Sequence, residues 1–221
     1  MVTVTPAPGA RSGSQKGFTL VELLVALMVT IAVVGGATLL AVQMQGSYQA
    51  QMDSASVQQD ARYVLEEVTR YLRQAGNNPY RVTTTSCPAA GTPFLPIRIN
   101  PDGDLLNDDV RIQMDANPTN GLIGGATGAC GETEEDVTIF HDAANRTVSV
   151  TDSNGATRSL SDAAVTSLLF AYRDPSHNVT TNPANVAFIQ TTVTVETRSR
   201  DLNQARTLQY TVASEVRVRS R

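Results

Sequence analysis

The feature that most constrains this chain is an apolar run near its N-terminus. The run extends from Phe18 to Val42, and the polar residues within it are Thr19, Glu22, Thr30 and Thr38. In a helix, about 25 residues at ~1.5 Å per residue extend roughly 37 Å, which is enough to cross a hydrocarbon layer of ~30 Å. The sequence therefore predicts one membrane-crossing helix over residues 18–42.

The preceding segment, residues 1–17, is rich in Thr, Pro, Gly and Ser, and its only charged residues are Arg11 and Lys16. By the positive-inside rule, these two cations keep the segment on the cytoplasmic side. An ordinary secretory signal has an apolar core of ~7–15 residues before its cleavage site, and this run is much longer. A plain signal anchor is the simplest alternative, but it gives Glu22 no role, although a carboxylate at mid-bilayer costs about 2.5–3.5 kcal/mol.

Residues 16–22, which read KGFTLVE, resemble the processing site of type IV prepilins and type II secretion pseudopilins. The resemblance covers the leader, the cleavage site and the apolar helix that follows. It implies that a membrane-embedded prepilin peptidase cuts between Gly17 and Phe18 and then methylates the new amine of Phe18. It also implies that Glu22 pairs with the terminal amine of a neighbouring subunit during assembly. Gly17 suits the cleavage position because it has no side chain to obstruct a protease.

The same resemblance implies partners and a location. The partners are other pilins through the N-terminal helix, prepilin peptidase, the inner-membrane assembly machinery, and membrane lipids before assembly. The chain would first cross the inner membrane once, with its head outside the cytoplasm, and would then enter a cell-surface filament. Such filaments serve twitching motility, DNA uptake, adhesion or secretion.

The helix is expected to continue beyond the membrane as an amphipathic half over residues 43–76. Apolar residues recur there at steps of three or four, which predicts a core-facing stripe; they are Val57, Ala61, Val64, Val68, Leu72 and Ala75. The sequence from Gly76 to Pro79 is a strong stop signal. Many major pilins have a proline within the apolar helix, but none lies between Phe18 and Pro79. Gly35 and Gly36 are the nearest substitute for a weak point, which favours a minor subunit or a pseudopilin.

Residues 77–221 predict a β-rich globular head, so the fold class is α+β and pilin-like, with a long N-terminal helix packed on an antiparallel sheet. Short alternating runs indicate strands over 97–99, 110–114, 137–140, 148–150, 168–173, 186–197 and 207–218. Turn signals occur at 142–145 and 152–155. The order of these pieces resembles the PilW type of minor pilin, particularly YLRQAG at 71–76, LLFAYR at 168–173 and VRVR at 216–219.

The composition argues against several classes of enzyme. The chain of 221 residues has a formal charge of −4, and Lys16 is its only lysine, so no lysine is placed for a phosphate-binding loop. Its two histidines, His141 and His177, have no neighbouring Cys or carboxylate at a spacing typical of catalysis or zinc. The sequence therefore predicts a structural protein without a cofactor and not an enzyme.

Two weaker predictions concern the head. Cys87 and Cys130 are expected to form a disulfide in an oxidising compartment, which would stabilise the fold by about 4 kcal/mol in the chain-entropy model. The oxygen-rich stretch that includes Asp102, Asp104 and Asp108 is a weak calcium candidate. Because it lacks the spacing of a twelve-residue calcium loop, a solvated acidic turn is the simpler interpretation.

The predicted function is a minor type IV pilin, a structural subunit of the filament or of its initiating or tip complex. A type II secretion pseudopilin is the alternative within the same class, because both share this N-terminus. A binding module at the filament tip, which captures DNA or a surface ligand, is the alternative from another class. It would depend on arginines near the C-terminus, namely Arg198, Arg200, Arg206, Arg217, Arg219 and Arg221.

Overall fold

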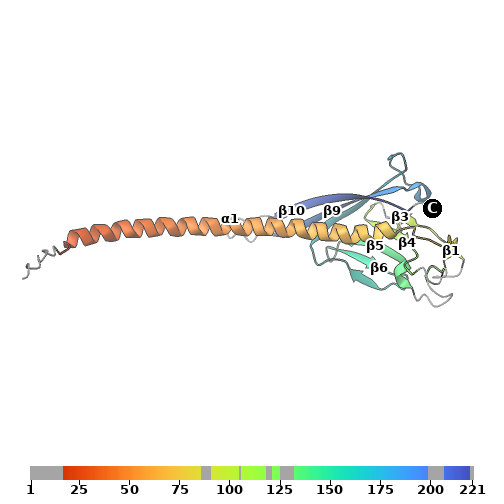
Figure 1. Ribbon diagram of the computed structural model, residues 1–221, viewed down its shortest axis with the longest axis horizontal. Helices are drawn as coiled ribbons and strands as arrows, with labels where there is room; N and C mark the ends of the chain where they lie inside the picture. Colours follow the sequence, from red (N-terminus) through yellow and green to blue (C-terminus); the bar gives the residue numbers. More distant parts are fainter. Residues whose placement is uncertain are drawn as a thin grey trace, which may run out of the picture. The chain divides into compact units, whose positions relative to one another are not determined.

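The structure is a computed structural model that describes residues 17–85, 91–104, 106–117, 121–124, 132–198 and 207–219. The chain divides into two compact units, Met1–Ser47 and Tyr48–Arg221. One helix, α1 (Leu20–Gln74), contributes to both units, and every described strand belongs to the second (Figure 1). At ~1.5 Å per residue, the 55 residues of α1 extend about 82 Å.

The C-terminal part of α1 supplies one wall of the head's core. Every member of the predicted apolar stripe is buried, with an exposed fraction of 2% or less, as the prediction requires. Leu65 and Tyr71 widen this stripe and are also buried. Helices of globular domains gain most of their stability from such a face, because packing contributes more than intrinsic helix propensity.

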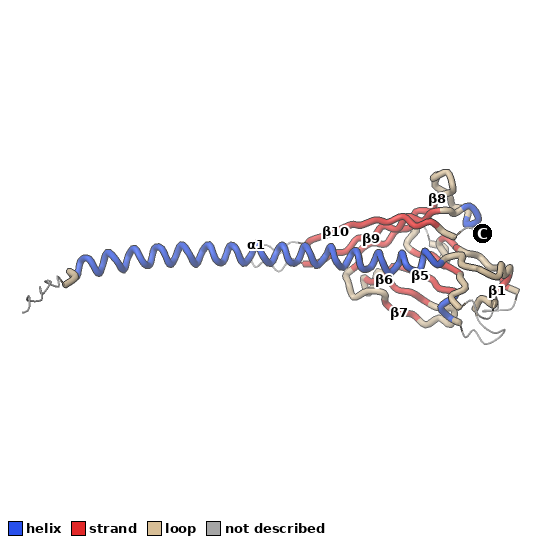
Figure 2. The backbone as a smooth tube through the Cα atoms, viewed as in Figure 1, coloured by secondary structure: helices blue, strands red, loops and turns tan. Residues whose placement is uncertain are grey.

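Two principal antiparallel sheets complete the head (Figure 2). The five-stranded sheet runs in chain order through β3 (Ile97–Ile99), β4 (Asp109–Gln113), β5 (Asp136–Asp142), β6 (Thr147–Thr151) and β7 (Thr157–Ser159). The three-stranded sheet has the order β10-β9-β8, formed by β8 (Val165–Arg173), β9 (Phe188–Arg198) and β10 (Thr207–Arg217). A two-stranded ribbon pairs β1 (Thr84–Thr85) with β2 (Thr92–Pro93), and two short 3₁₀ helices, η1 (Thr133–Glu135) and η2 (Pro183–Asn185), precede β5 and β9.

Both principal sheets and the helix stripe share one hydrophobic core. Alternate residues of β9 are buried, including Ile189, Val193 and Val195, because successive side chains of a strand point to opposite faces. The pairing of β9 with β10 is unbroken from Phe188 opposite Arg217 to Arg198 opposite Thr207. The predicted α+β, pilin-like fold is therefore confirmed.

The structure refines the predicted strands. The range 97–99 coincides with β3, and β4, β5, β6 and β8 differ from prediction by one to three residues at an end. The predicted strand at 186–197 begins too early, because η2 ends at Asn185 and β9 begins only at Phe188. The sheet expected on the helix is divided into two principal sheets, and neither β7 nor the β1–β2 ribbon was expected. These short segments lack the alternating apolar pattern that reveals a strand in sequence.

Candidate processing and assembly site

The predicted cleavage site lies outside the helix. Gly17 and Phe18 are exposed and have no regular secondary structure, and α1 begins only at Leu20. An added Cβ at Gly17 would meet nothing within 4 Å, and 82% of the Phe18 surface is exposed. The bond between these residues is therefore presented without helical structure and without cover from the described residues.

Thr19 caps the start of α1. Its side-chain Oγ1 accepts the N–H of Glu22 at 3.3 Å, and its carbonyl accepts the N–H of Leu23 at 3.2 Å. A Thr followed three residues later by Glu is the pattern of a capping box, in which the hydroxyl pairs with an N–H that the helix leaves unpaired. In the sequence, Thr19 is a polar interruption of the apolar run, and its spacing from Glu22 is the signal that indicates the cap.

The cap also places Glu22 in the first turn of α1. The N-terminus of a helix carries a partial positive charge from its aligned peptide dipoles, so a carboxylate is favourable there. Glu22 therefore has a local stabilising role in the single chain, in addition to any role in assembly.

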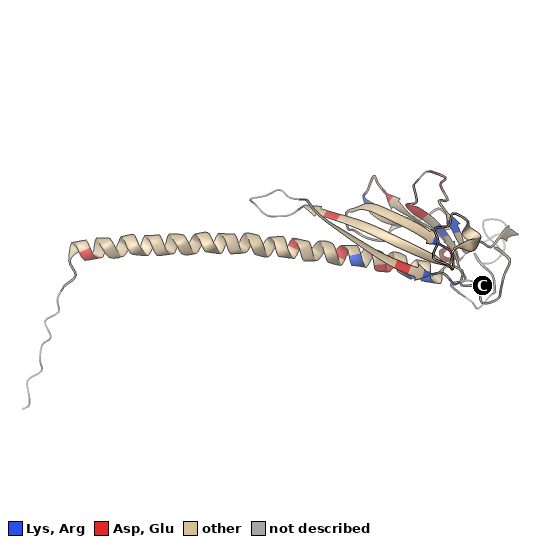
Figure 3. Cartoon of the chain, turned by 90° about the horizontal axis from the view of Figure 1, so that it is seen from above, with Lys and Arg blue, Asp and Glu red and all other residues tan. Residues whose placement is uncertain are grey.

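The helix after Glu22 is suited to an apolar environment. By length and composition, α1 is long enough and apolar enough to cross a membrane. Its most apolar window has a mean hydropathy of 2.5, and none of that window is buried within the structure. No charged residue lies between Glu22 and Asp53 in the sequence, and Figure 3 shows a correspondingly long stretch of α1 without charged side chains. Exposed apolar side chains at this density require cover from lipid or from neighbouring helices.

The two threonines of this stretch satisfy their hydrogen-bonding groups within α1. The Thr30 hydroxyl donates to the Ala26 carbonyl at 2.8 Å, and the Thr38 hydroxyl donates to the Gly35 carbonyl at 2.8 Å. Inside a bilayer, polar groups must find partners in the protein because water is absent. Gly35 and Gly36 do not interrupt the helix, which is continuous through both.

In the head, the residues suspected of chemistry are scattered. His141 Nε2 lies 3.1 Å from the Val165 carbonyl, and His177 stacks on Phe188 with the ring centroids 4.3 Å apart. Arg219 donates to Asn77 Oδ1 at 3.0 Å, and Arg217 is exposed on β10. Arg200, Arg206 and Arg221 lie outside the described residues, as do Cys87 and Cys130, so the disulfide stays a prediction.

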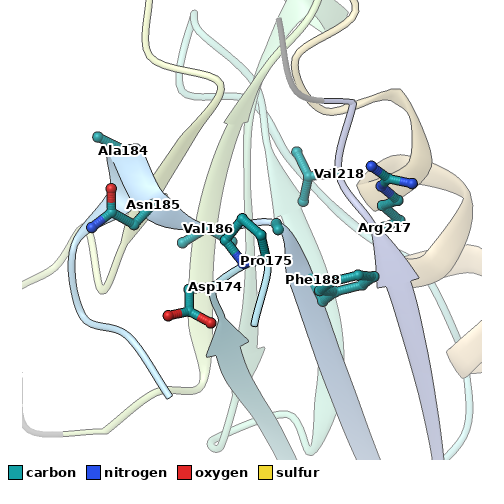
Figure 4. Close-up of a pocket in the computed structure, with 9 residues that line it drawn as sticks. Asp174, Pro175, Ala184, Asn185, Val186, Phe188, Arg217 and Val218 are labelled. Atoms are coloured by element: carbon teal, nitrogen blue, oxygen red, sulfur yellow. The ribbon is translucent and has the colours of Figure 1, made fainter. Parts of the chain in front are cut away.

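A hollow of 480 Å³ lies beside His177's stacking partner, Phe188 (Figure 4). In this view, the Asp174 carboxylate and the Arg217 guanidinium lie on opposite sides of Pro175 and Phe188. Asp174 Oδ1 accepts the N–H groups of Ser176 and Asn178 at 2.8 and 2.9 Å, which lowers its pKa. This carboxylate organises its own turn, so the hollow offers no acid and base that act together.

The most buried acids of the head hold backbone together. Glu135 is 1% exposed, and its two carboxylate oxygens accept the N–H groups of Ala116, Asn117 and Gly124 at 2.7–3.0 Å. Arg111 donates to both oxygens of Asp136 at 2.6 Å. From the sequence, Glu135 and Asp136 are expected on a solvated face, and this expectation is wrong, because nothing in the local pattern shows that an acid next to a strand will be enclosed.

The acidic stretch forms the loop between β3 and β4. Asp102 Oδ1 accepts the N–H of Asp104 at 3.1 Å, and Asp104 Oδ1 accepts the N–H of Leu106 at 2.6 Å. Asp102 and Asp104 are exposed, whereas Asp108 is half-buried. In the part of the chain that the structure describes, no three His, Cys, Asp or Glu side chains already converge as a metal site.

The N-terminal site is also the region that matches a known family. Residues 13–38 match the model of the prokaryotic N-terminal methylation motif. No curated protein and no solved structure matches the chain. The matched range contains the exposed bond between Gly17 and Phe18, the Thr19 cap, Glu22 and most of the apolar run that ends at Val42. Together, this match and the α+β fold support the resemblance to type IV pilin-like and pseudopilin-like prepilins.

Proposed function

We propose that the chain is a minor type IV pilin, a structural subunit of the pilus filament or of its initiating or tip complex. The observation that carries this proposal is the combination at the N-terminus: a methylation motif over residues 13–38 followed by a helix whose apolar surface is exposed in the single chain. Such a helix can be held by lipid before assembly and by the helices of other subunits afterwards.

The proposed assembly uses two groups that the motif brings close together. Cleavage after Gly17 leaves a cationic amine on Phe18, and Glu22 lies about one helical turn further along the chain. In a filament, the Glu22 carboxylate of one subunit would pair with the Phe18 amine of its neighbour and set their register, while apolar burial supplies most of the affinity. Loss of one member of a buried ion pair costs about 3–5 kcal/mol, because the other charge is then left without a partner.

A type II secretion pseudopilin is the second candidate, and one observation favours keeping it. The helix α1 is unbroken from Leu20 to Gln74 and contains no proline, unlike that of many major pilins. This property suits a minor pilin and a pseudopilin equally. A tip module for DNA is less well supported, because Arg219 already donates to Asn77.

The test is recovery of the chain in filaments sheared from cells of its native host. A minor pilin is expected in the sheared fraction, and Glu22→Ala is expected to retain the processed chain in the membrane. Asp162→Asn, at an exposed acid of the head, is the control and is expected to behave as wild type. Dependence of surface recovery on the secretion channel, with no chain in sheared pili, would instead assign the protein to a secretion pseudopilus.

A further inference from the structure

The hairpin loop between β3 and β4 places side-chain oxygens at regular intervals. The loop connects Ile99 to Val110, which are paired across the sheet. Counted from Asn100 as the first place, the first, third, fifth and ninth places hold side chains with oxygen atoms. These four residues are Asn100, Asp102, Asp104 and Asp108, and Asp109 follows directly after the last of them. Alternate oxygens of this kind let one short loop surround a cation. The twelfth place holds Arg111 in place of an acid, which is why the sequence alone favoured a solvated turn.

The structure shows that Asp109, at the end of this loop, has a buried carboxylate, which the sequence alone could not reveal. It is 3% exposed, and its Oδ1 is buried without a hydrogen-bond partner. Its Oδ2 accepts the N–H of Asp102 at 3.2 Å, which holds the carboxylate against the loop. Its backbone is fixed from the other side, because the Tyr172 hydroxyl donates to the Asp109 carbonyl at 3.3 Å. Buried polar atoms in proteins usually have a partner, so the unpaired carboxylate oxygen at this position is available to bind a ligand.

The charges around Asp109 are of one sign. Asp102, Asp104 and Asp108 all lie close enough to Asp109 to interact electrostatically with its carboxylate. Within the described residues, none of these four acids takes part in a salt bridge. A divalent cation would offset this concentration of negative charge.

We propose that the β3–β4 loop binds a divalent cation, with Ca²⁺ preferred, through Asn100, Asp102, Asp104, Asp108 and the unpartnered Oδ1 of Asp109. Ca²⁺ accepts six to eight oxygen ligands in flexible geometry, whereas Mg²⁺ requires a tighter octahedral arrangement. Asp102 and Asp104 each use one oxygen for a loop N–H, so their second oxygens are free to turn toward the ion. Binding therefore draws together carboxylates that do not yet converge in the described structure.

The position of the loop gives this site a structural consequence. The Asn107 carbonyl accepts the N–H of Phe170, which belongs to β8 in the other principal sheet, at 2.7 Å. The Asp108 carbonyl accepts the N–H of His141 on β5 at 3.2 Å. An ion held by the loop would thus stiffen a connection between the two sheets. Modules outside the cytoplasm bind Ca²⁺ with Kd values of about 10⁻⁴–10⁻³ M, and we expect this range here.

The test is titration of the full-length protein, purified in a non-ionic detergent, with CaCl₂ followed by calorimetry and thermal unfolding. One site is expected, together with a rise of several degrees in Tm at ~10 mM Ca²⁺. Equal concentrations of MgCl₂, and NaCl of equal ionic strength, are expected to produce smaller shifts. Asp104→Asn and Asp109→Asn are each expected to weaken binding at least tenfold; Asp104 is exposed, so its variant tests binding without a change in the core.

Asp152→Asn is the matched control. Asp152 organises the β6–β7 turn in a similar way, since its Oδ1 accepts the N–H groups of Asn154 and Ala156 at 2.9 Å. This variant is expected to bind Ca²⁺ as wild type does. The proposal would be overturned by the absence of binding heat and of a Ca²⁺-specific Tm shift, or by an equal loss of binding in Asp152→Asn and Asp104→Asn.

Discussion

Thr19 determines where α1 begins and so separates the bond between Gly17 and Phe18 from the regular helix. Its hydroxyl pairs with the N–H of Glu22, and regular helix starts one residue after it. Proteases act most readily on backbone that is outside regular structure, and the bond between Gly17 and Phe18 meets this condition. One hydroxyl therefore stabilises the start of the helix and, in the processing proposed above, also leaves the bond accessible to the peptidase.

Replacing Thr19 by Val is expected to remove the cap and to fray the first turn. Loss of a Thr cap costs about 1 kcal/mol, so hydrogen exchange at the Glu22 amide should accelerate about fivefold in detergent. Thr30→Val is the control, because the Thr30 hydroxyl donates to the Ala26 carbonyl within the helix and does not pair with an N–H group at the start of the helix. Equal protection of the Glu22 amide in Thr19→Val and wild type would show that the hydroxyl does not cap the helix.

Asp115 is a second residue whose environment predicts a measurable effect. It is fully buried, and neither carboxylate oxygen has a hydrogen-bond partner. Burial raises its pKa above the usual 3.8, and the charge of Glu132 adds to this, against a smaller opposing effect of the nearby Asn117 N–H, which donates to Glu135. Because the folded state holds the proton more tightly, the contribution to stability is fully present below the unfolded pKa and is lost as the pH rises through the folded pKa.

Asp115→Asn removes the ionisable group and keeps its size. The variant is therefore expected to melt about 2–4 °C above wild type at pH 7.5 and to lose this advantage near pH 4, which thermal unfolding across that range measures. Asp162→Asn, at an exposed acid, controls for the change in net charge. A Tm difference between Asp115→Asn and wild type that is the same at both pH values would contradict the assignment.

At the scale of the element, the end of α1 depends on Gly76. Its φ of +75° lies in the left-handed region that favours glycine, and its N–H donates to the Gln113 carbonyl of β4 at 2.9 Å. An added Cβ would lie 2.7 Å from the Arg219 carbonyl oxygen, which is too close for an unstrained contact. The helix thus ends where the chain must pass against both β4 and the segment after β10.

Gly76→Ala is expected to destabilise the head by about 2–3 kcal/mol, since it adds a backbone clash to the left-handed conformation. Gly155→Ala is the matched comparison: its φ is +82°, but an added Cβ there would meet nothing within 4 Å. This variant should lose only ~1 kcal/mol. Chemical denaturation of the two variants measures the difference, and equal losses would mean that the contact with Arg219 contributes nothing.

Elements with a strong period could be predicted from sequence, whereas those defined by distant contacts could not. The stripe from Val57 to Ala75 follows the helical period, and it is buried as expected. The Asp142 turn was also predicted, and Asp142 Oδ1 accepts the N–H of Asn145 at 3.0 Å. By contrast, β7 consists of three exposed polar residues, and Glu135 is enclosed by backbone from 11 to 19 residues away along the chain. Neither the strand β7 nor the burial of Glu135 produces a local sequence pattern from which it could be predicted.

At the scale of the whole molecule, the two units carry different physical properties. The unit Met1–Ser47 contains the methylation motif and an apolar helix surface, and the unit Tyr48–Arg221 contains the buried core and both principal sheets. Cleavage after Gly17 would remove Arg11 and Lys16 and change the formal charge from −4 to −6. The mature chain would then contain no lysine, so its basic contacts would depend on arginine alone.

The most direct test of the processing claim is the intact mass of the protein from cells with and without a functional prepilin peptidase. With the peptidase, we predict a chain that begins at Phe18 and carries one added methyl group; without it, we predict the chain from Met1. A chain that still begins at Met1 in peptidase-containing cells, or that is cut elsewhere, would contradict the account. The apolar run would then be a plain membrane anchor, and the function would reside in the head.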